Sequence, residues 1–328
     1  MAMPQDVEAG LRALRSGAAW SALDDRSLLA VRGADRASFL QGMLANDVTS
    51  LREGGGVYAL LLTEQGRVVG DIRVLALADE LWLDVAGERR AAVRAALERF
   101  VVADDVEIEE RSDVAIALRG PRASEVVERV FGHDVAELPE CGHAGAGAAG
   151  QRLRIARVRD AGADGFVVWA ESRAAARAVA SAIGQAGSEE APVEAVEVLR
   201  IAGGWAREGI DFDEKTLAPE VPSLGRSISY RKGCYLGQEV VERVAARGHV
   251  NWLVLRLEGE GSTAPGAGAP VRKDGNEVGR VTSAAVDGGR FVAIARIRRE
   301  ASEVGSGLEI DAPGGALAAR VAETPAPA

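Results

Sequence analysis

Residues 232–239, KGCYLGQE, place a thiol, a phenol, an ammonium group and two glycines within eight positions. Gly233 and Gly237 can adopt a positive φ or let the backbone approach a ligand closely. The residues that follow, 238–246, have the spacing of a short helix. The sequence therefore predicts a tight loop that delivers reactive side chains and backbone N–H groups to a helix N-terminus.

Cys234 is the residue of this loop that invites a mechanism. The neighbouring cations Arg231 and Lys232, together with a helix start, could lower its pKa and leave a reactive thiolate. The alternative is a small buried apolar side chain, and the sequence leaves both open. A single cysteine cannot supply the four thiolates that usually hold an iron–sulfur cluster, so stable cluster binding by this chain is not expected.

The same loop and helix invert the charge of the chain. The whole chain has 39 basic and 49 acidic side chains, a formal charge of −10, and should repel nucleic acid and anionic membranes. Between residues 226 and 248 the balance is +3, because five cations face two anions. These are Arg226, Arg231, Lys232, Arg243 and Arg247 against Glu239 and Glu242, and Glu239 and Arg243 are spaced as i,i+4 partners. The segment is either an anion-binding surface or a solvated domain junction.

Two other places carry groups that suit a ligand. Asp71 lies among apolar residues, where a carboxylate is costly unless it is paired or functional. In GGWAREGIDF, residues 203–212, Trp205 and Phe212 flank charged residues, which suits a flat heterocycle through stacking and paired hydrogen bonds. A buried salt bridge and ordinary aromatic packing are the alternatives.

Missing motifs exclude several classes of function. The sequence has no Walker loop, no GxGxxG after a first strand, no GxSxG elbow and no HExxH. Its histidines, His133, His143 and His249, lack zinc-type spacing, so no metal is predicted. The run CGHAGAGAAG from Cys141 is expected to be a flexible linker. Without a secretory signal or a long apolar run, the protein is expected to be soluble and cytoplasmic.

The elements that position these groups alternate between strands and helices. The first segment is expected to hold a strand at 27–31, a helix at 34–44, a hairpin of strands 57–63 and 67–77, a strand at 81–85 and a helix at 88–102. A second segment from residue 113 has a β-α-β-β-α order that resembles a ferredoxin-like split unit, and a helix follows at 192–202. Beyond residue 248, strands at 250–257, 277–286 and 290–297 predict a small all-β domain.

The motif residues resemble a known signature. Lys232, Gly233, Cys234, Tyr235, Gly237, Gln238 and Glu239, with Arg243, resemble the signature of the YgfZ family, relatives of the glycine-cleavage T-protein (GcvT, aminomethyltransferase). FLQG at 39–42, LLLTEQGRVVGD at 60–71 and VGRVTS at 278–283 also match, so the resemblance extends from about residue 22 to 320. It implies a GcvT-like α+β architecture of three lobes, in which two α+β subdomains and a C-terminal β-barrel surround a central folate channel.

The resemblance also implies limits and roles. The limits are an N-terminal extension (1–21), a folate-binding region (22–247) built from subdomain 22–112 joined by 192–247 and subdomain 113–191, a barrel (248–322) and a disordered tail (323–328). Tetrahydrofolate, or a one-carbon derivative, would bind near Asp71, Arg200, Trp205, Tyr235 and Arg243, with Cys234 as a candidate reactive thiol.

The function implied is that of a tetrahydrofolate-binding accessory protein of iron–sulfur cluster assembly or repair, which supports cluster-dependent enzymes such as tRNA-modifying ones. Its partners would be folate and iron–sulfur assembly proteins or their clients. The alternative is an aminomethyltransferase that moves a one-carbon unit from a lipoyl-bound aminomethyl group to tetrahydrofolate.

Two departures argue against the alternative. The GYTGExGFE-like motif of T-proteins appears here as RDAGADGFV, residues 159–167, with Ala163 at the anchoring glutamate. Asp164 lies beside it, but a shift of one residue moves a carboxylate to the other face of a strand. Gly70 stands where T-proteins often carry a second acid beside Asp71.

Overall fold

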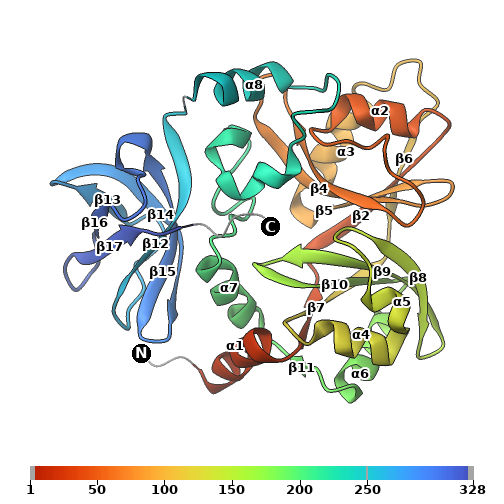
Figure 1. Ribbon diagram of the computed structural model, residues 1–328, viewed down its shortest axis with the longest axis horizontal. Helices are drawn as coiled ribbons and strands as arrows, with labels where there is room; N and C mark the ends of the chain where they lie inside the picture. Colours follow the sequence, from red (N-terminus) through yellow and green to blue (C-terminus); the bar gives the residue numbers. More distant parts are fainter. Residues whose placement is uncertain (1–3, 249, 324–328) are drawn as a thin grey trace.

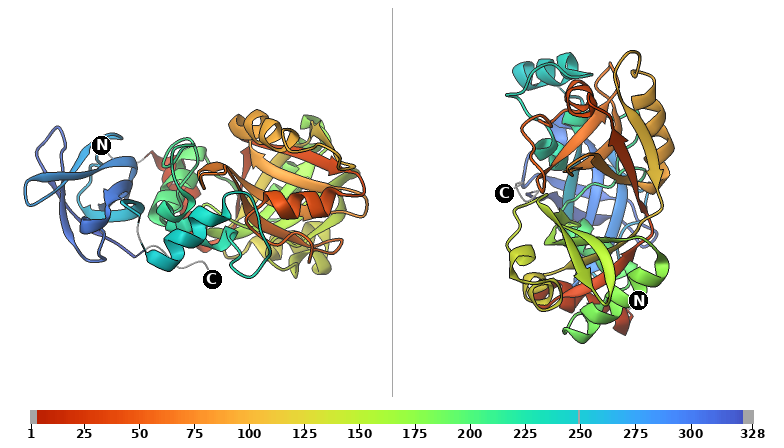
Figure 2. Two further views of the ribbon diagram at one scale, coloured as in Figure 1. Left: turned by 90° about the horizontal axis from the view of Figure 1, so that it is seen from above. Right: turned by 90° about the vertical axis from the view of Figure 1, so that its right-hand side faces the viewer.

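Two β-sheets and a closed β-barrel make up the protein, whose computed structural model describes residues 4–248 and 250–323 (Figure 1). The sheets lie at one end of the long axis and the barrel at the other, with α7 (Val193–Ala202) and α8 (Gln238–Arg247) between them (Figure 2). The predicted α+β class and C-terminal barrel are confirmed. His249 and most of the predicted tail lie outside the described residues.

The first sheet is antiparallel in the order β3-β4-β5-β2-β6. Its elements are β2 (Arg26–Arg32), α2 (Arg36–Met43), β3 (Gly56–Leu62), β4 (Val68–Ala76), β5 (Leu81–Ala86), the 3-10 turn η1 (Gly87–Arg89), α3 (Arg90–Glu98) and β6 (Glu107–Arg111). Helices α2 and α3 bury their apolar sides against one face of the sheet, with Leu40 and Val93 fully buried. The predicted hairpin is confirmed, because β3 pairs with β4 around Gly66, whose φ is 72°.

The second sheet has the order β11-β1-β7-β10-β9-β8, with α4 and α6 on one face. Its elements are β1 (Ala19–Leu23), β7 (Val114–Arg119), α4 (Ala123–Phe131), α5 (His133–Ala136), β8 (His143–Ala148), β9 (Gln151–Asp160), β10 (Ala163–Ala170), α6 (Arg173–Gln185) and β11 (Glu189–Glu190). The prediction of a flexible linker at the run from Cys141 is wrong, because this run forms β8. A strand ladder uses backbone groups alone, so alanine and glycine suffice there, and the buried His143 ring fixes the strand on the Ala76 carbonyl at 2.9 Å.

The bare faces of the two sheets pack on each other. Leu28, Leu75 and Trp82 of the first sheet meet Val167 and Trp169 of the second in a shared apolar layer. The result is a helix, sheet, sheet, helix sandwich. Its edge beside β1 lies next to α7, against which α1 (Gln5–Ser16) packs. The sequence reasoning predicted neither α1 nor β1.

The barrel closes in the order β12-β15-β14-β13-β16-β17 around its own apolar core. Its strands are β12 (Trp252–Glu260), β13 (Pro270–Lys273), β14 (Asn276–Asp287), β15 (Arg290–Arg298), β16 (Gly307–Ile310) and β17 (Leu317–Val321). The turn between β13 and β14 holds Asp274 and Gly275 at φ of 51° and 80°, the left-handed pair that a tight hairpin needs. Within the described part of the chain, no helix is long and apolar enough to cross a bilayer.

Candidate functional site

A cavity of about 680 Å³ lies where the two sheets meet α7 and the loop of residues 203–212. Its wall comes from the turn between β1 and β2, from β3 and β4, from α7 and from this loop. The volume falls in the range of small-molecule sites. Among the described residues of its wall, none has a number above that of Arg226, so none comes from the barrel strands. The barrel can shape the cavity only through the segments that it contacts.

Asp71 places a carboxylate on this wall from β4. Its Oδ2 accepts a hydrogen bond from Tyr58 Oη at 2.9 Å, and Arg26 approaches it at 4.0 Å. The side chain is 17% exposed, so it can meet a ligand while its position stays defined. Burial, and then the charge of Asp71, raises the pKa of Tyr58 well above its usual value, so the phenol is a proton donor at neutral pH.

A buried ionic group holds this wall from behind. Arg26 Nε donates to Asp84 Oδ1 at 2.8 Å, and Arg73 donates to Oδ2 at 3.0 Å, while the Asp84 side chain is fully buried. A buried carboxylate is tolerated when it accepts charge-assisted bonds in this way. The group therefore fixes the direction in which Arg26 faces Asp71.

Glu208 is a second carboxyl group of the cavity wall, and the sequence reasoning missed it. Its residue is 5% exposed, and Oε2 accepts only a long bond of 3.4 Å from the Asp71 amide. Burial, followed by the charge of Asp71, raises the pKa of Glu208 to about 8. The clue in the sequence was its place among the charged residues that Trp205 and Phe212 flank in the 203–212 loop.

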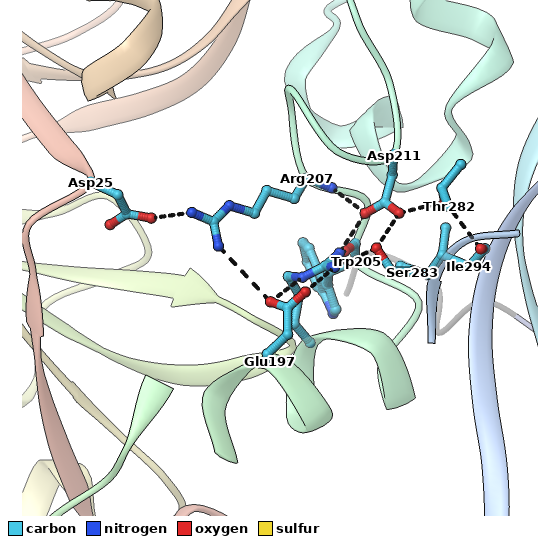
Figure 3. Close-up of polar contacts among 9 residues, drawn as sticks. Asp25, Glu197, Trp205, Arg207, Asp211, Thr282, Ser283 and Ile294 are labelled. Atoms are coloured by element: carbon cyan, nitrogen blue, oxygen red, sulfur yellow. Dashed lines mark hydrogen bonds and ion pairs between the residues drawn. The ribbon is translucent and has the colours of Figure 1, made fainter. Parts of the chain in front are cut away.

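Arg200 was predicted to touch folate, and the structure gives its guanidinium other partners. Among them are Glu197, Asp211 and Ser283, which Figure 3 labels. Arg200 is buried on α7 and donates to Asp211 at 2.6 Å, to Glu197 at 2.5 Å and to Ser283 Oγ at 3.0 Å. Asp211 also accepts bonds from the hydroxyls of Thr282 and Ser283 on β14. Arg200 therefore borders the cavity with its donors already engaged, as a clamp between α7, the 203–212 loop and the barrel.

Trp205 lines the cavity, and an arginine covers it. Arg226 lies between two rings, with its guanidinium carbon 4.7 Å from the Trp205 centroid and 4.8 Å from that of Tyr58. Arg226 is held there by Glu140 and by the Arg159 carbonyl at 3.0 Å. A planar ligand that stacks on this face of Trp205 must displace Arg226.

The motif of residues 232–239 lies away from the cavity wall. Lys232 Nζ donates to the carbonyls of Gln41, Leu44 and Asn46 at 2.5, 2.6 and 3.1 Å. A Cβ at Gly237, where φ is 81°, would lie 2.4 Å from the Thr63 carbonyl oxygen. The motif therefore ties the end of α2 and the hairpin turn to α8, whose predicted helix is confirmed.

The remaining motif residues divide between core and surface. Tyr235 is buried in the junction between the first sheet and the barrel, while Cys234, Glu239 and Arg243 are exposed. The described contacts include no ion pair between Glu239 and Arg243, although their spacing favours one. Of the five predicted folate residues, the structure brings Asp71, Arg200 and Trp205 together at the cavity and places Tyr235 and Arg243 elsewhere.

The hairpin at residues 159–167, where β9 turns into β10, shows why Asp164 cannot replace a carboxylate at Ala163. Asp164 forms an ion pair with Arg157 at 2.7 Å and is absent from the described cavity wall. Arg159 does line the cavity, and it has no ion-pair partner among the described residues. The structure thus offers a free cation to a ligand there.

No metal site is found among the described residues, since no three His, Cys, Asp or Glu side chains come together to hold an ion. Cys141 and His143 are both buried. Burial raises the pKa of Cys141 to about 11 and, with Arg154, lowers that of His143 to about 4. Both side chains therefore act as neutral packing groups at physiological pH.

Comparison with known proteins adds the following matches. The model described as GCVT N-terminal domain matches residues 2–232, and the glycine cleavage T-protein C-terminal barrel domain matches residues 252–326. The chain is 31% identical to an aminomethyltransferase of Thermus thermophilus over 77% of this chain and 71% of the relative, and 28% identical to one of Geobacillus kaustophilus over 90% and 84%. It shares the fold of glycine cleavage system aminomethyltransferase T from Bartonella henselae, with a TM-score of 0.86 and 22% identity over 99% of this chain and 90% of that one.

These matches overturn the expected role in iron–sulfur cluster assembly. The relatives carry the name of the alternative, aminomethyltransferase, and the structural neighbour belongs to the glycine cleavage system. The resemblance to the YgfZ family centred on the motif of residues 232–239, and in the structure this motif packs segments together away from the cavity. The expected iron–sulfur partners and the link to tRNA modification are accordingly dropped.

Proposed function

Because this chain belongs to the glycine cleavage T-protein family, we propose that it is an aminomethyltransferase that passes a one-carbon unit to tetrahydrofolate in the cavity beside Asp71. Folate would supply the nitrogen that accepts the carbon. The cavity is large enough for such a ligand, and its wall combines an aromatic ring, carboxyl groups and cations, as a pterin with an acidic tail requires.

The position of the Asp71 carboxylate on the cavity wall is the observation that supports the proposal most strongly. A nitrogen that forms a bond to carbon must lose a proton, and a carboxylate within hydrogen-bond reach can take it. Asp71 is held in one direction by Tyr58 and Arg26, yet its side chain stays partly exposed to the cavity. We assign it the role of general base.

Arg159 is the residue we assign to the ligand's acidic end. Its guanidinium lines the cavity without an ion-pair partner among the described residues, so it can pair with a carboxylate. The aromatic contact falls to Trp205, once Arg226 has moved from its face. These three roles place the reacting end of the ligand near β4 and its acidic end near β9.

We propose two finer assignments. The motif at residues 232–239 supports a place on the YgfZ branch of the family. The limits 22–247 for the folate-binding region and 248–322 for the barrel follow the break between the sandwich with its connecting segments and the barrel strands. Neither assignment bears on the activity.

The test combines binding with transfer. Titration with tetrahydrofolate should quench tryptophan fluorescence, and the protein should release ammonia from an aminomethylated lipoyl carrier only when tetrahydrofolate is present. Asp71→Asn should lower the rate of transfer by about 10²- to 10⁴-fold while binding persists. Asp79→Asn, on the exposed turn after β4, is the matched control and should leave the rate unchanged. Absence of binding up to millimolar tetrahydrofolate, or full transfer by Asp71→Asn, would contradict the proposal.

A further inference from the structure

The space beside Asp71 at Gly70 is too small for any side chain at position 70. A Cβ built on Gly70 would lie 2.7 Å from Val93 Cγ2 on α3, which is closer than packed carbon atoms approach. The next nearest atom to that Cβ is Glu208 Oε2, at 4.0 Å. The carboxyl group nearest this place therefore comes from the 203–212 loop, more than a hundred residues away in sequence.

Glu208 is buried with very few hydrogen-bond donors. Its Oε1 lies 2.9 Å from Arg89 Nε but receives no hydrogen bond among the described residues, because Arg89 directs its N–H groups to the Val69 carbonyl at 3.2 and 3.1 Å. Its Oε2 has the long bond from the Asp71 amide. A buried carboxylate without donors is costly, whereas a carboxylic acid in the same place is not.

We propose that Glu208 is the second acid of the reaction centre: it holds a proton at neutral pH and gives it to the group that leaves the transferred carbon, while Asp71 works as the base. The two residues then form a pair that carries one proton and one negative charge, the arrangement that separates acid and base roles between neighbouring carboxyl groups. This inference rests on the proposed transfer reaction.

The proton balance of the step closes without an oxidant or a reductant. The attacking nitrogen forms its bond to carbon with its lone pair and releases its proton to Asp71. The bond from carbon to the departing heteroatom breaks, its electron pair stays on that atom, and the atom takes the proton of Glu208. Asp71 ends protonated and Glu208 ends ionised, so the pair carries the same total charge before and after.

The charged groups around Glu208 set the pH at which its carboxyl group loses its proton. Asp71 on β4 favours the protonated form, while Arg89 on η1 and Arg26 on β2 favour the ionised form, and burial outweighs both cations. The pKa of Glu208 is raised to about 8, so the acid is present below that pH and disappears as the pH rises through it. Transfer should therefore fall on the alkaline side with a midpoint near pH 8.

The test reads the proton directly as well as the rate. Difference infrared spectra of the ligand-free protein should contain a carboxylic-acid carbonyl band that titrates near pH 8 and is missing in Glu208→Gln. The same variant should lower transfer at least tenfold at pH 7 and remove the alkaline limb of the pH profile. Glu214→Gln is the matched control, because Glu214 is exposed and approaches the same Arg89 at 3.9 Å. It should leave both the band and the rate as they are.

The outcomes separate this inference from the proposed function. If no carboxylic-acid band is present at neutral pH, or if Glu208→Gln keeps the wild-type rate and pH profile, the inference is overturned while the transferase stands. If wild-type protein binds tetrahydrofolate but transfers nothing, the proposed function fails and the donor role fails with it. The infrared titration still decides in that case whether Glu208 holds a proton.

Discussion

Glu208 and Asp211 are two acids of one loop, three residues apart and both buried, and their surroundings are opposite. Asp211 accepts four bonds, from Arg200, the Arg207 amide and two hydroxyls of β14. Glu208 accepts a single long one. Asp211 is thus a structural group whose oxygens are saturated with donors, while Glu208 faces the cavity as an acid that its environment keeps neutral.

This contrast distinguishes the buried acids that stabilise the fold from those that can take part in a reaction. A buried charge that is saturated with donors has little left to offer a ligand, and its removal leaves its partners unpaired. A buried acid with few donors lowers stability, and a fold keeps such a group where it has use for the proton.

The largest effect on stability should follow from Asp211→Ala. The change leaves the buried Arg200 guanidinium without its fully buried carboxylate partner, so the free energy of unfolding should fall by about 3–5 kcal/mol. Urea denaturation followed by circular dichroism measures it, with Glu214→Ala, an exposed residue just after the loop, as the control. A loss below about 1 kcal/mol would remove the structural role of Asp211.

Lys232→Met should come next. Three carbonyl groups at the end of α2 lose their shared donor, and the free energy of unfolding should fall by about 2–3 kcal/mol. Tetrahydrofolate affinity of the folded variant should stay within about twofold of wild type, because Lys232 lies outside the described cavity wall. Arg231→Met, at an exposed neighbour, is the control. A large loss of affinity in a stable Lys232→Met would return the motif to the binding site.

Glu208→Gln should move stability in the other direction from Asp211→Ala. The folded protein keeps a proton on Glu208 up to about pH 8, while the unfolded chain loses it near the ordinary value of 4.5, so wild-type stability should fall between these two pH values. Glutamine carries no such proton, and the variant should gain about 1–2 kcal/mol over wild type at pH 8 relative to pH 6.5. Denaturation midpoints at the two pH values measure the gain. An equal offset at both would mean that Glu208 is ionised in the folded state.

The smallest effect should come from Cys234→Ser. The thiol is exposed and lies outside the described cavity wall, so stability should change by less than about 0.5 kcal/mol and transfer should be unchanged. Denaturation and the transfer assay measure both. A tenfold loss of transfer would reopen the thiol as a reacting group.

The sequence predicted those features that depend on neighbours along the chain. The hairpin around Gly66, the helix after Gly237 and the long barrel strands β12, β14 and β15 follow from periodicity and turn residues. The short barrel strands β13, β16 and β17 were not predicted. Strand β8 was missed because its alanines and glycines have no apolar pattern, although its backbone pairs fully with β9.

The site was harder to predict, because its residues meet only in the fold. Arg200 and Asp71 are both charged residues in apolar surroundings, and only the contacts show that one is saturated and the other open to the cavity. The structure shows that the Glu208 carboxyl group lies close to Gly70, and therefore next to Asp71. Residues that meet only in the fold, from distant parts of the chain, show no regular spacing in the sequence by which they could be recognised.

The bonds from Thr282 and Ser283 to Asp211 have a consequence for how the molecule comes apart. Through them, β14 of the barrel holds the loop that carries Glu208, although the barrel adds nothing to the described cavity wall. The barrel and the sandwich should therefore melt in a single cooperative transition instead of two. A ligand in the cavity should delay hydrogen exchange in β14, on the far side of the clamp.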